Sequence, residues 1–145
     1  MNDKIIKLFL RFAISIGFLS ALADRLRFWS QEVSAWGNWT SFLEYTELIN
    51  LWFPNSMIPA VGIIATTAEV LFAICLIIGL KTEFVAKLSG ILLLLFGLSM
   101  MFSIGIKPVF DYSVFIASAA AFALSLMKFK YFELDSLISK PIPEK

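Results

Sequence analysis

The sequence predicts an all-α membrane protein with four transmembrane helices and one amphipathic helix at the membrane surface. Of its 145 residues, 59% are hydrophobic and only 16% are charged, and the mean hydropathy is +0.85. Soluble domains are typically about 45–50% apolar and about 25% charged, so this composition is that of a membrane protein. Four apolar runs are each long enough for a transmembrane helix, at about 5–26, 57–80, 84–106 and 110–127.

The first span begins with basic side chains and ends in a charged stretch. Three basic residues stand at its start: Lys4, Lys7 and Arg11. Long basic side chains at a helix end extend to the lipid headgroups, and Asp24 and Arg25 close the span. A second interpretation is a signal peptide, because residues 21–23 resemble a cleavage site after a basic start. We favour the transmembrane helix, since small residues continue along one of its faces.

The external segment 28–54, between the first two spans, is aromatic and contains all four tryptophans of the chain. Four of its apolar residues recur at helical spacing: Phe42, Tyr45, Ile49 and Trp52. This spacing predicts an amphipathic helix in the membrane interface, where Trp and Tyr keep an apolar body and a polar tip. The segment is either an aromatic anchor or a lid, with Trp36 and Trp39 at the lip of a site for a flat ligand such as a quinone.

The second span, 57–80, contains a single charged residue, Glu69. A carboxylate near the middle of a bilayer costs on the order of several kcal/mol unless it is neutralised or paired, so Glu69 should face protein. Gly62, Thr66 and Ala73 share its helix face, and the Thr66 hydroxyl can hydrogen-bond to the acid. Two interpretations stay open: a proton, quinone or solute site, and a structural buried acid.

An arginine of the first span is the expected partner of Glu69. Arg11 and Arg25 lie on roughly one face of that span, nearly four helical turns apart. We predict that one of them approaches Glu69, and we favour Arg11 because it lies within the apolar run. The candidate buried polar site therefore comprises Glu69, Thr66 and Arg11.

Polar residues also gather where the first and third spans end. A tight link at 81–83 makes the second and third spans antiparallel neighbours, so the third span ends on the same side as the first, at Lys107-Pro108. A candidate outer polar cluster comprises five residues: Asp24, Arg25, Lys107, Asp111 and Tyr112.

The distribution of basic residues predicts the orientation in the membrane. The start of the chain, the 81–83 link with its flank and the tail 128–145 hold nine Lys and Arg residues, against three on the opposite side. Because cytoplasmic loops carry the excess of Lys and Arg, both termini and the tail are expected in the cytoplasm and the aromatic segment outside.

The composition also excludes several kinds of chemistry. The chain has no histidine and one cysteine, Cys75, so it cannot supply histidine ligands, a Ser-His-Asp triad, an internal disulfide or a CxxC pair. A net charge of +1 gives no basic field for nucleic acid. We expect no metal site and no cofactor held by this chain alone, with quinone as the one possible bound cofactor.

Four motifs in order resemble the DoxX family of small bacterial membrane proteins. They are ADR after the first span, AxxAE within the second, a short G-x-x-T link and KxxxDYSVF before the fourth. The resemblance covers about 8–126, although Lys81 and Glu83 stand in the link where relatives often have an arginine. It implies a four-helix bundle in the bacterial cytoplasmic membrane. It also implies a role beside membrane redox chemistry, because the family is related to the DoxD-like subunit of a thiosulfate:quinone oxidoreductase.

Three functions follow as hypotheses. The first is an accessory subunit of a quinone-linked redox system, without catalysis of its own, that receives electrons from a partner protein. The second is a small proton or solute transporter in which Glu69 is the gate. The third is a membrane scaffold in which Glu69 is structural. The lipid bilayer is the expected partner in all three, and a redox protein or a homo-oligomer is possible in the first.

Overall fold

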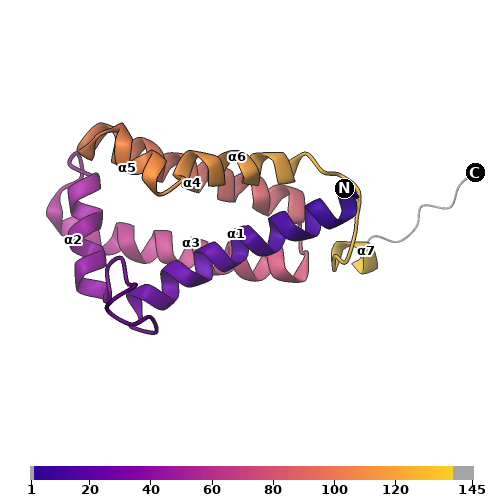
Figure 1. Cartoon of the computed structure of the whole chain (residues 1–145), viewed down its shortest axis with the longest axis horizontal. Helices are drawn as coiled ribbons and strands as arrows, with labels where there is room; N and C mark the ends of the chain where they lie inside the picture. The colour runs from indigo at the N-terminus through magenta and orange to yellow at the C-terminus, as the bar shows by residue number, and fades with distance from the viewer. Residues whose placement is uncertain (1, 139–145) are drawn as a thin grey trace, which may run out of the picture.

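The computed structural model of this chain describes residues 2–138, which are largely helical and contain no β-strand. The elements are α1 (Asp3–Arg25), α2 (Trp39–Ile49), the 3₁₀ turn η1 (Asn55–Met57), α3 (Ile58–Ile78), α4 (Thr82–Ile104), α5 (Ile106–Asp111), α6 (Val114–Ser125) and α7 (Asp135–Ile138). Helices α1, α3, α4 and α6 run along one common direction, α2 crosses one end, and α7 lies at the other (Figure 1). We call the end that α2 crosses the Arg25 end, and the end where α7 lies the Arg11 end.

Three helices within the described residues are long and apolar enough to cross a membrane: Asp3–Arg25, Asn55–Ile78 and Thr82–Ile104. At about 1.5 Å per residue each is roughly 35 Å long, which exceeds the hydrocarbon core of about 30 Å. Large apolar side chains such as Phe9, Ile64 and Phe102 are exposed on their outer faces. The chain is therefore an integral membrane protein whose apolar helix faces contact lipid.

The fourth predicted span is not one continuous helix. The chain forms α5 and α6 with a break at Tyr112 and Ser113, and Ser113 has φ +54°, in the left-handed region. A non-glycine residue in that region cannot continue a right-handed helix. Helix α6 alone is only about 18 Å long, so the prediction of one helix over 110–127 is wrong.

Close packing of small residues joins the helices around an apolar centre. Helix α6 packs along α4, and α1 packs along α3. Eight buried residues form this centre: Ile14, Phe18, Ala73, Leu76, Val85, Ala86, Ala121 and Leu124. The three alanines have no exposed surface, which lets the helix backbones approach each other. This apolar centre lies between the polar side chains of the two ends.

Helix α2 covers the Arg25 end of the bundle. It begins after Asn38, whose side-chain oxygen accepts a hydrogen bond from the backbone N–H of Ser41 at 2.9 Å. Its buried residues Phe42, Thr46 and Ile49 face α3 and α4, which α2 contacts. Trp52, which we predicted on the apolar face of this helix, lies beyond its end and is 55% exposed.

The first part of the predicted tail packs against the Arg11 end. Residues 127–138 follow α6, cross the ends of α1 and α3, and include the short helix α7 (Figure 1). The last part of that tail, 139–145, lies outside the described residues.

Candidate functional site

Glu69 forms a buried ion pair with Arg25 at the Arg25 end. Both residues are 3% exposed. The Arg25 Nη2 donates to Glu69 Oε1 at 3.2 Å, and Nη1 donates to Oε2. Nη1 also donates to the Thr66 hydroxyl oxygen at 2.6 Å, one helical turn along α3. The structure therefore places a carboxylate, a hydroxyl and a guanidinium together on facing sides of α1 and α3.

Arg25 occupies the position that we assigned to Arg11. In a helix the Cα–Cβ bond tilts toward the N-terminus, so Arg25, in the last turn of α1, extends back along its helix toward Glu69. Arg11 lies about 21 Å away along α1 and contacts the opposite end of α3 instead. The preference for Arg11 rested on its depth in the apolar run, which does not fix the register between two helices.

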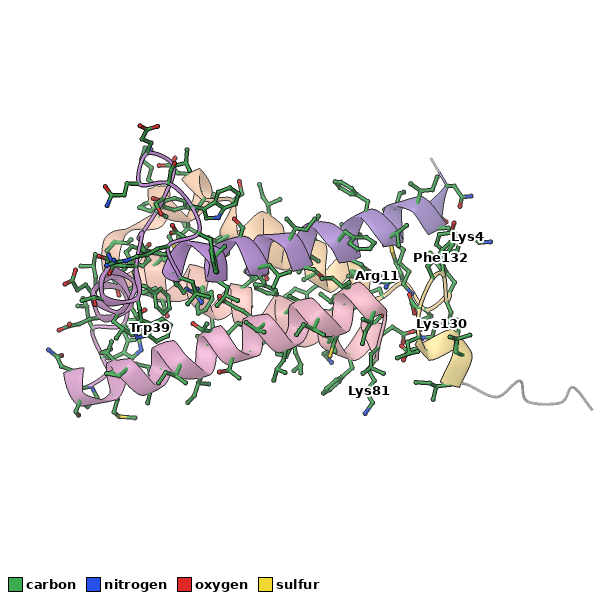
Figure 2. All side chains as sticks on the ribbon, turned by 90° about the horizontal axis from the view of Figure 1, so that it is seen from below. Lys4, Arg11, Trp39, Lys81, Lys130 and Phe132 are labelled. Carbon is green, nitrogen blue, oxygen red and sulfur yellow. The ribbon has the colours of Figure 1, made fainter. Side chains whose placement is uncertain are left out.

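Aromatic rings enclose the Arg25 guanidinium. Its Cζ lies 3.9 Å from the centroid of the Phe42 ring and 5.2 Å from the Trp36 ring. The Trp36 and Trp39 rings each lie 5.3 Å from the Phe42 ring. Trp39 is seen at this end of the molecule in Figure 2. The two candidate lip residues thus join Phe42 in an aromatic cover, in which cation–π attraction favours the charged guanidinium.

One donor of this arginine has no partner. The Nε–H of Arg25 is buried and has no hydrogen-bond acceptor among residues 2–138. An unsatisfied buried donor costs about 1–3 kcal/mol, and nearly all such groups in folded proteins have a partner. An acceptor oxygen of a bound molecule would satisfy this N–H.

Asp24 holds the loop that carries Trp36. Its carboxylate accepts hydrogen bonds from the Ser34 hydroxyl, from the Ala35 N–H at 3.1 Å and from the Trp36 N–H at 2.8 Å. Adjacent residues of α1 therefore have separate roles, because Asp24 positions the cover and Arg25 pairs with Glu69. We predicted Asp24 only as a member of an outer cluster, and no sequence signal connects it to the loop ten residues later.

Trp36 also borders an open hollow on the loop after α1. The hollow has a volume of about 560 Å³, and most of its lining side chains are polar or aromatic, including Trp29, Ser34 and Asn38. Trp36 therefore both lines this hollow and lies against the Arg25 guanidinium.

The predicted outer polar cluster is divided between two places. Lys107 and Asp111 form an ion pair with each other on α5, with side chains 81% and 54% exposed, and Tyr112 is exposed beside them. Within the described part of the chain, no hydrogen bond or ion pair joins these three to Asp24 or Arg25. The expectation of one cluster is therefore corrected, because α5 carries its own ion pair, Asp24 binds the loop at 34–36 and Arg25 pairs with Glu69.

A second buried arginine is found at the Arg11 end, where Figure 2 shows Arg11 beside the tail. Its Nε donates to the Leu76 carbonyl at 2.9 Å and its Nη2 to the Ile77 carbonyl at 2.9 Å. Its Nη1 donates to the Tyr131 and Phe132 carbonyls at 3.0 and 2.8 Å. The last carbonyls of a helix have no intrahelical donor, so Arg11 satisfies two of them and fastens the tail to α3.

The tail completes this end of α3. The N–H of Leu134 in the tail donates to the Ile78 carbonyl at 3.0 Å. At the helix end itself, the Leu80 N–H donates to the Cys75 carbonyl at 2.8 Å. Gly79 ends the helix with φ +71°, and a Cβ there would lie 2.5 Å from the Glu133 Cα. Only glycine therefore allows both the turn and the close approach of the tail.

Ion pairs and hydrogen bonds also hold the tail against α1 and the start of α4. Lys7 and Glu133 pair at 2.6 Å with no exposed side-chain surface. The Asp135 carboxylate accepts from the backbone N–H groups of Lys81 at 2.8 Å and Thr82 at 3.2 Å, at the start of α4. Burial works against the charge, but these hydrogen bonds and nearby Lys130 keep the pKa of Asp135 below its ordinary value. The sequence shows these acids only as ordinary tail charges, so this cluster was missed.

Comparisons with protein-family models, with curated proteins and with solved structures found no match to this chain. The resemblance to the DoxX family therefore stays a prediction from its four motifs. Residues of these motifs do make contacts with one another: Arg25 of ADR pairs with Glu69 of AxxAE, and Lys107 of KxxxDYSVF pairs with Asp111. Among residues 2–138 no cluster of three or more His, Cys, Asp or Glu residues suits a metal ion.

Proposed function

We propose that this protein is an accessory subunit of a quinone-linked membrane redox system, and that it binds a quinone headgroup between Arg25, Glu69 and Trp36. The observation that supports this most directly is the unpaired Nε–H of Arg25. A quinone ring is flat and apolar, and its carbonyl oxygens accept hydrogen bonds. One carbonyl would accept from that N–H, and the ring would pack against the aromatic side chains of Trp36 and Phe42.

Glu69 would supply the protons for quinone reduction. Reduction of a quinone to a quinol takes up two electrons and two protons. The Glu69 carboxylate would take up one proton at a time from the outer aqueous side and pass it to a quinone oxygen, so two rounds of uptake and transfer would supply both protons. The Thr66 hydroxyl would orient the oxygen that receives the proton. The chain has no histidine and a single cysteine, so the electrons would come from a partner redox protein.

Access to the site would depend on Trp36. This side chain lines the open hollow and covers Arg25, and the Asp24 carboxylate holds its backbone. Displacement of the ring would admit a headgroup from the outer surface without separating α1 from α3.

The rest of the assignment rests on sequence patterns. The four motifs support membership of the DoxX family, and with it a bacterial cytoplasmic membrane. The distribution of Lys and Arg supports cytoplasmic termini, and the Arg25 end would then face outward. Helices α5 and α6 would together form the fourth crossing, with the break at Ser113 near its outer end. A redox protein or a second copy of the chain would dock from the membrane plane or the outer face.

Calorimetric titration of the purified protein in detergent with short-tailed ubiquinone and menaquinone analogues tests this proposal. We expect saturable binding that weakens at least about tenfold in Trp36→Ala and in Arg25→Lys, since lysine keeps the charge but cannot present the guanidinium fork. Trp52→Ala is the matched control, because this exposed tryptophan lies outside the site.

Two results would overturn the proposal and favour the other hypotheses. Proton or solute flux in liposomes that contain only this protein, together with no quinone binding, would indicate a transporter. Loss of stability in Glu69→Gln without any saturable quinone binding by the wild type would indicate a scaffold whose acid is structural.

A further inference from the structure

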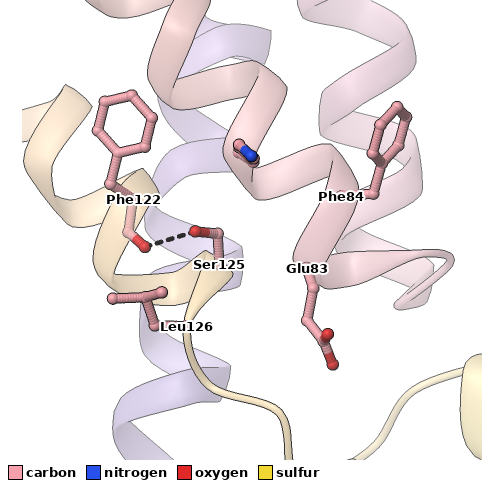
Figure 3. A pocket seen from close by; sticks show the side chains of 6 residues that line it. Glu83, Phe84, Phe122, Ser125 and Leu126 are labelled. Atoms are coloured by element: carbon pink, nitrogen blue, oxygen red, sulfur yellow. Dashed lines mark hydrogen bonds between the residues drawn. The ribbon is translucent and has the colours of Figure 1, made fainter.

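A groove opens on the side of the bundle at the Arg11 end, between the start of α4 and the end of α6 (Figure 3). It has a volume of about 440 Å³. Six residues line it: Glu83, Phe84, Lys87, Phe122, Ser125 and Leu126. The groove is separate from the Arg25–Glu69 pair and shares no residue with it.

The walls of the groove are apolar and their positions are set by helix packing. Phe122 packs against α4 at Gly90, where an added Cβ would lie 2.9 Å from its ring. Leu126 is 77% exposed and Phe84 is also exposed, so both present carbon surface outward. The Ser125 hydroxyl donates to the Phe122 carbonyl at 2.6 Å, which leaves no free hydroxyl hydrogen in the groove. Such a surface fits a hydrocarbon chain.

The polar rim of the groove carries one acid, Glu83, and one base, Lys87. The carboxylate of Glu83 pairs with Lys130 at 2.9 Å. Burial works against the charge of Lys130, but Glu83, Glu133 and Asp135 together raise its pKa above the ordinary value. Lys87 is exposed and forms no ion pair within the described residues, and Lys81 and Lys128 are exposed at the same end. The charge that remains uncompensated at the groove is therefore that of Lys87.

We infer that this groove binds one anionic phospholipid, with an acyl chain along Phe84, Phe122 and Leu126 and the headgroup phosphate at Lys87. Lys87 lies five residues after the first residue of α4, about 8 Å along the helix, which is the depth of headgroups for a lysine that extends outward. The excess of Lys and Arg predicts that this end faces the cytoplasm, where anionic lipids attract basic residues between transmembrane helices. The inference does not depend on the quinone proposal.

Native mass spectrometry of the protein in a neutral detergent tests the site, with phosphatidylglycerol and phosphatidylcholine of identical acyl chains as the probes. We expect one phosphatidylglycerol to bind about fivefold more tightly than phosphatidylcholine. One lysine near an anionic headgroup contributes roughly 1 kcal/mol, which corresponds to this factor. Lys87→Gln should remove this preference, and Lys87→Arg should restore it. Lys81→Gln is the matched control, because Lys81 is an exposed lysine at the same end that does not line the groove.

Two further measurements distinguish recognition of the acyl chain from recognition of the phosphate. Leu126→Trp, which fills the groove at an exposed position, should weaken both lipids, and glycerol 3-phosphate should not displace the bound lipid. Equal losses in Lys87→Gln and Lys81→Gln would overturn the inference in favour of diffuse charge attraction. Equal binding of the two lipids by the wild type would overturn it as well, because the groove would then not recognise a charged headgroup. Displacement by glycerol 3-phosphate would show an anion site without a lipid chain and would overturn it as well.

Discussion

The two ends of the bundle each bury an arginine of α1, but they satisfy it differently. Arg11 donates four hydrogen bonds to backbone carbonyls, two of which lie in the last turn of α3. Arg25 pairs with one carboxylate and one hydroxyl, lies against aromatic rings and keeps one N–H without an acceptor. Each nitrogen of the first arginine donates at least one hydrogen bond to a backbone carbonyl. The second faces side chains that can exchange partners, which is what a binding site requires.

Removal of one partner at the Arg25 end should have the largest effect on stability. Arg25→Ala leaves the Glu69 carboxylate buried with only Thr66 beside it, which should cost about 3–5 kcal/mol of unfolding free energy. Reversible denaturation in mixed micelles measures this loss. The double variant Arg25→Met, Glu69→Leu should recover most of the stability while quinone binding stays absent. A double variant as unstable as Arg25→Ala would contradict the assignment of this cost to an unpaired charge.

The corresponding change at the Arg11 end should loosen the tail and spare the site. Arg11→Met leaves the Leu76 and Ile77 carbonyls without donors, and we expect a loss of about 2–3 kcal/mol. Hydrogen exchange of the Leu134 and Asp135 amides should accelerate, because their acceptors lie on α3 and Gly79. The affinity for quinone analogues should change less than about threefold. A loss as large as that of Trp36→Ala would show that the two ends are not independent.

Two glycine substitutions should change the unfolding free energy in opposite directions. Gly79→Ala places an alanine at φ +71° and against the Glu133 backbone, so it should lower the unfolding free energy by about 1–2 kcal/mol. Gly17→Ala lies within α1, where an added Cβ meets nothing within 4 Å, and should raise it by about 0.5–1 kcal/mol. Similar effects of the two variants would mean that the tail does not pack on Gly79 as described.

The smallest expected effect is a pH dependence at the Arg11 end. The folded protein holds the pKa of Asp135 below its ordinary value, so the charged form stabilises the fold. This contribution is fully present above the unfolded pKa of about 3.9 and is lost as the pH falls through the lower folded value. Asp135→Asn should lose about 0.5–1 kcal/mol at neutral pH and flatten the acid limb of the stability curve. Glu44→Gln, at an exposed position of α2, is the control and should leave that limb unchanged.

Long apolar runs made the three spanning helices predictable, because such a run has few alternatives in a membrane protein. The burial of Glu69 followed from the cost of a lone charge in lipid. The identity of its partner did not follow, since helical period places Arg11 and Arg25 on similar faces and only packing fixes the register of α1 against α3. The break at Ser113 was equally invisible, because the apolar composition continues through it.

Contacts between distant parts of the chain explain the remaining differences between the sequence-based predictions and the structure. Asp135 accepts from backbone N–H groups more than fifty residues away, and Arg11 reaches carbonyls of α3 and of the tail. Side chains that bind backbone groups far away in the sequence leave no motif, so the whole Arg11 end appeared as ordinary basic and acidic residues. The Arg25 end was partly predictable because its partners are a charged residue in an apolar run and a cluster of tryptophans.

The most direct test is infrared difference spectroscopy of the reconstituted protein on addition of a ubiquinone analogue, with Glu69→Gln and Glu133→Gln to assign the carboxyl bands. The Arg25 end is proposed to exchange partners and the Arg11 end to keep them. The Glu69 band should therefore shift on binding, and the Glu133 band should stay where it is. A Glu69 band that does not respond, or a Glu133 band that shifts equally, would contradict the division of roles between the two arginines.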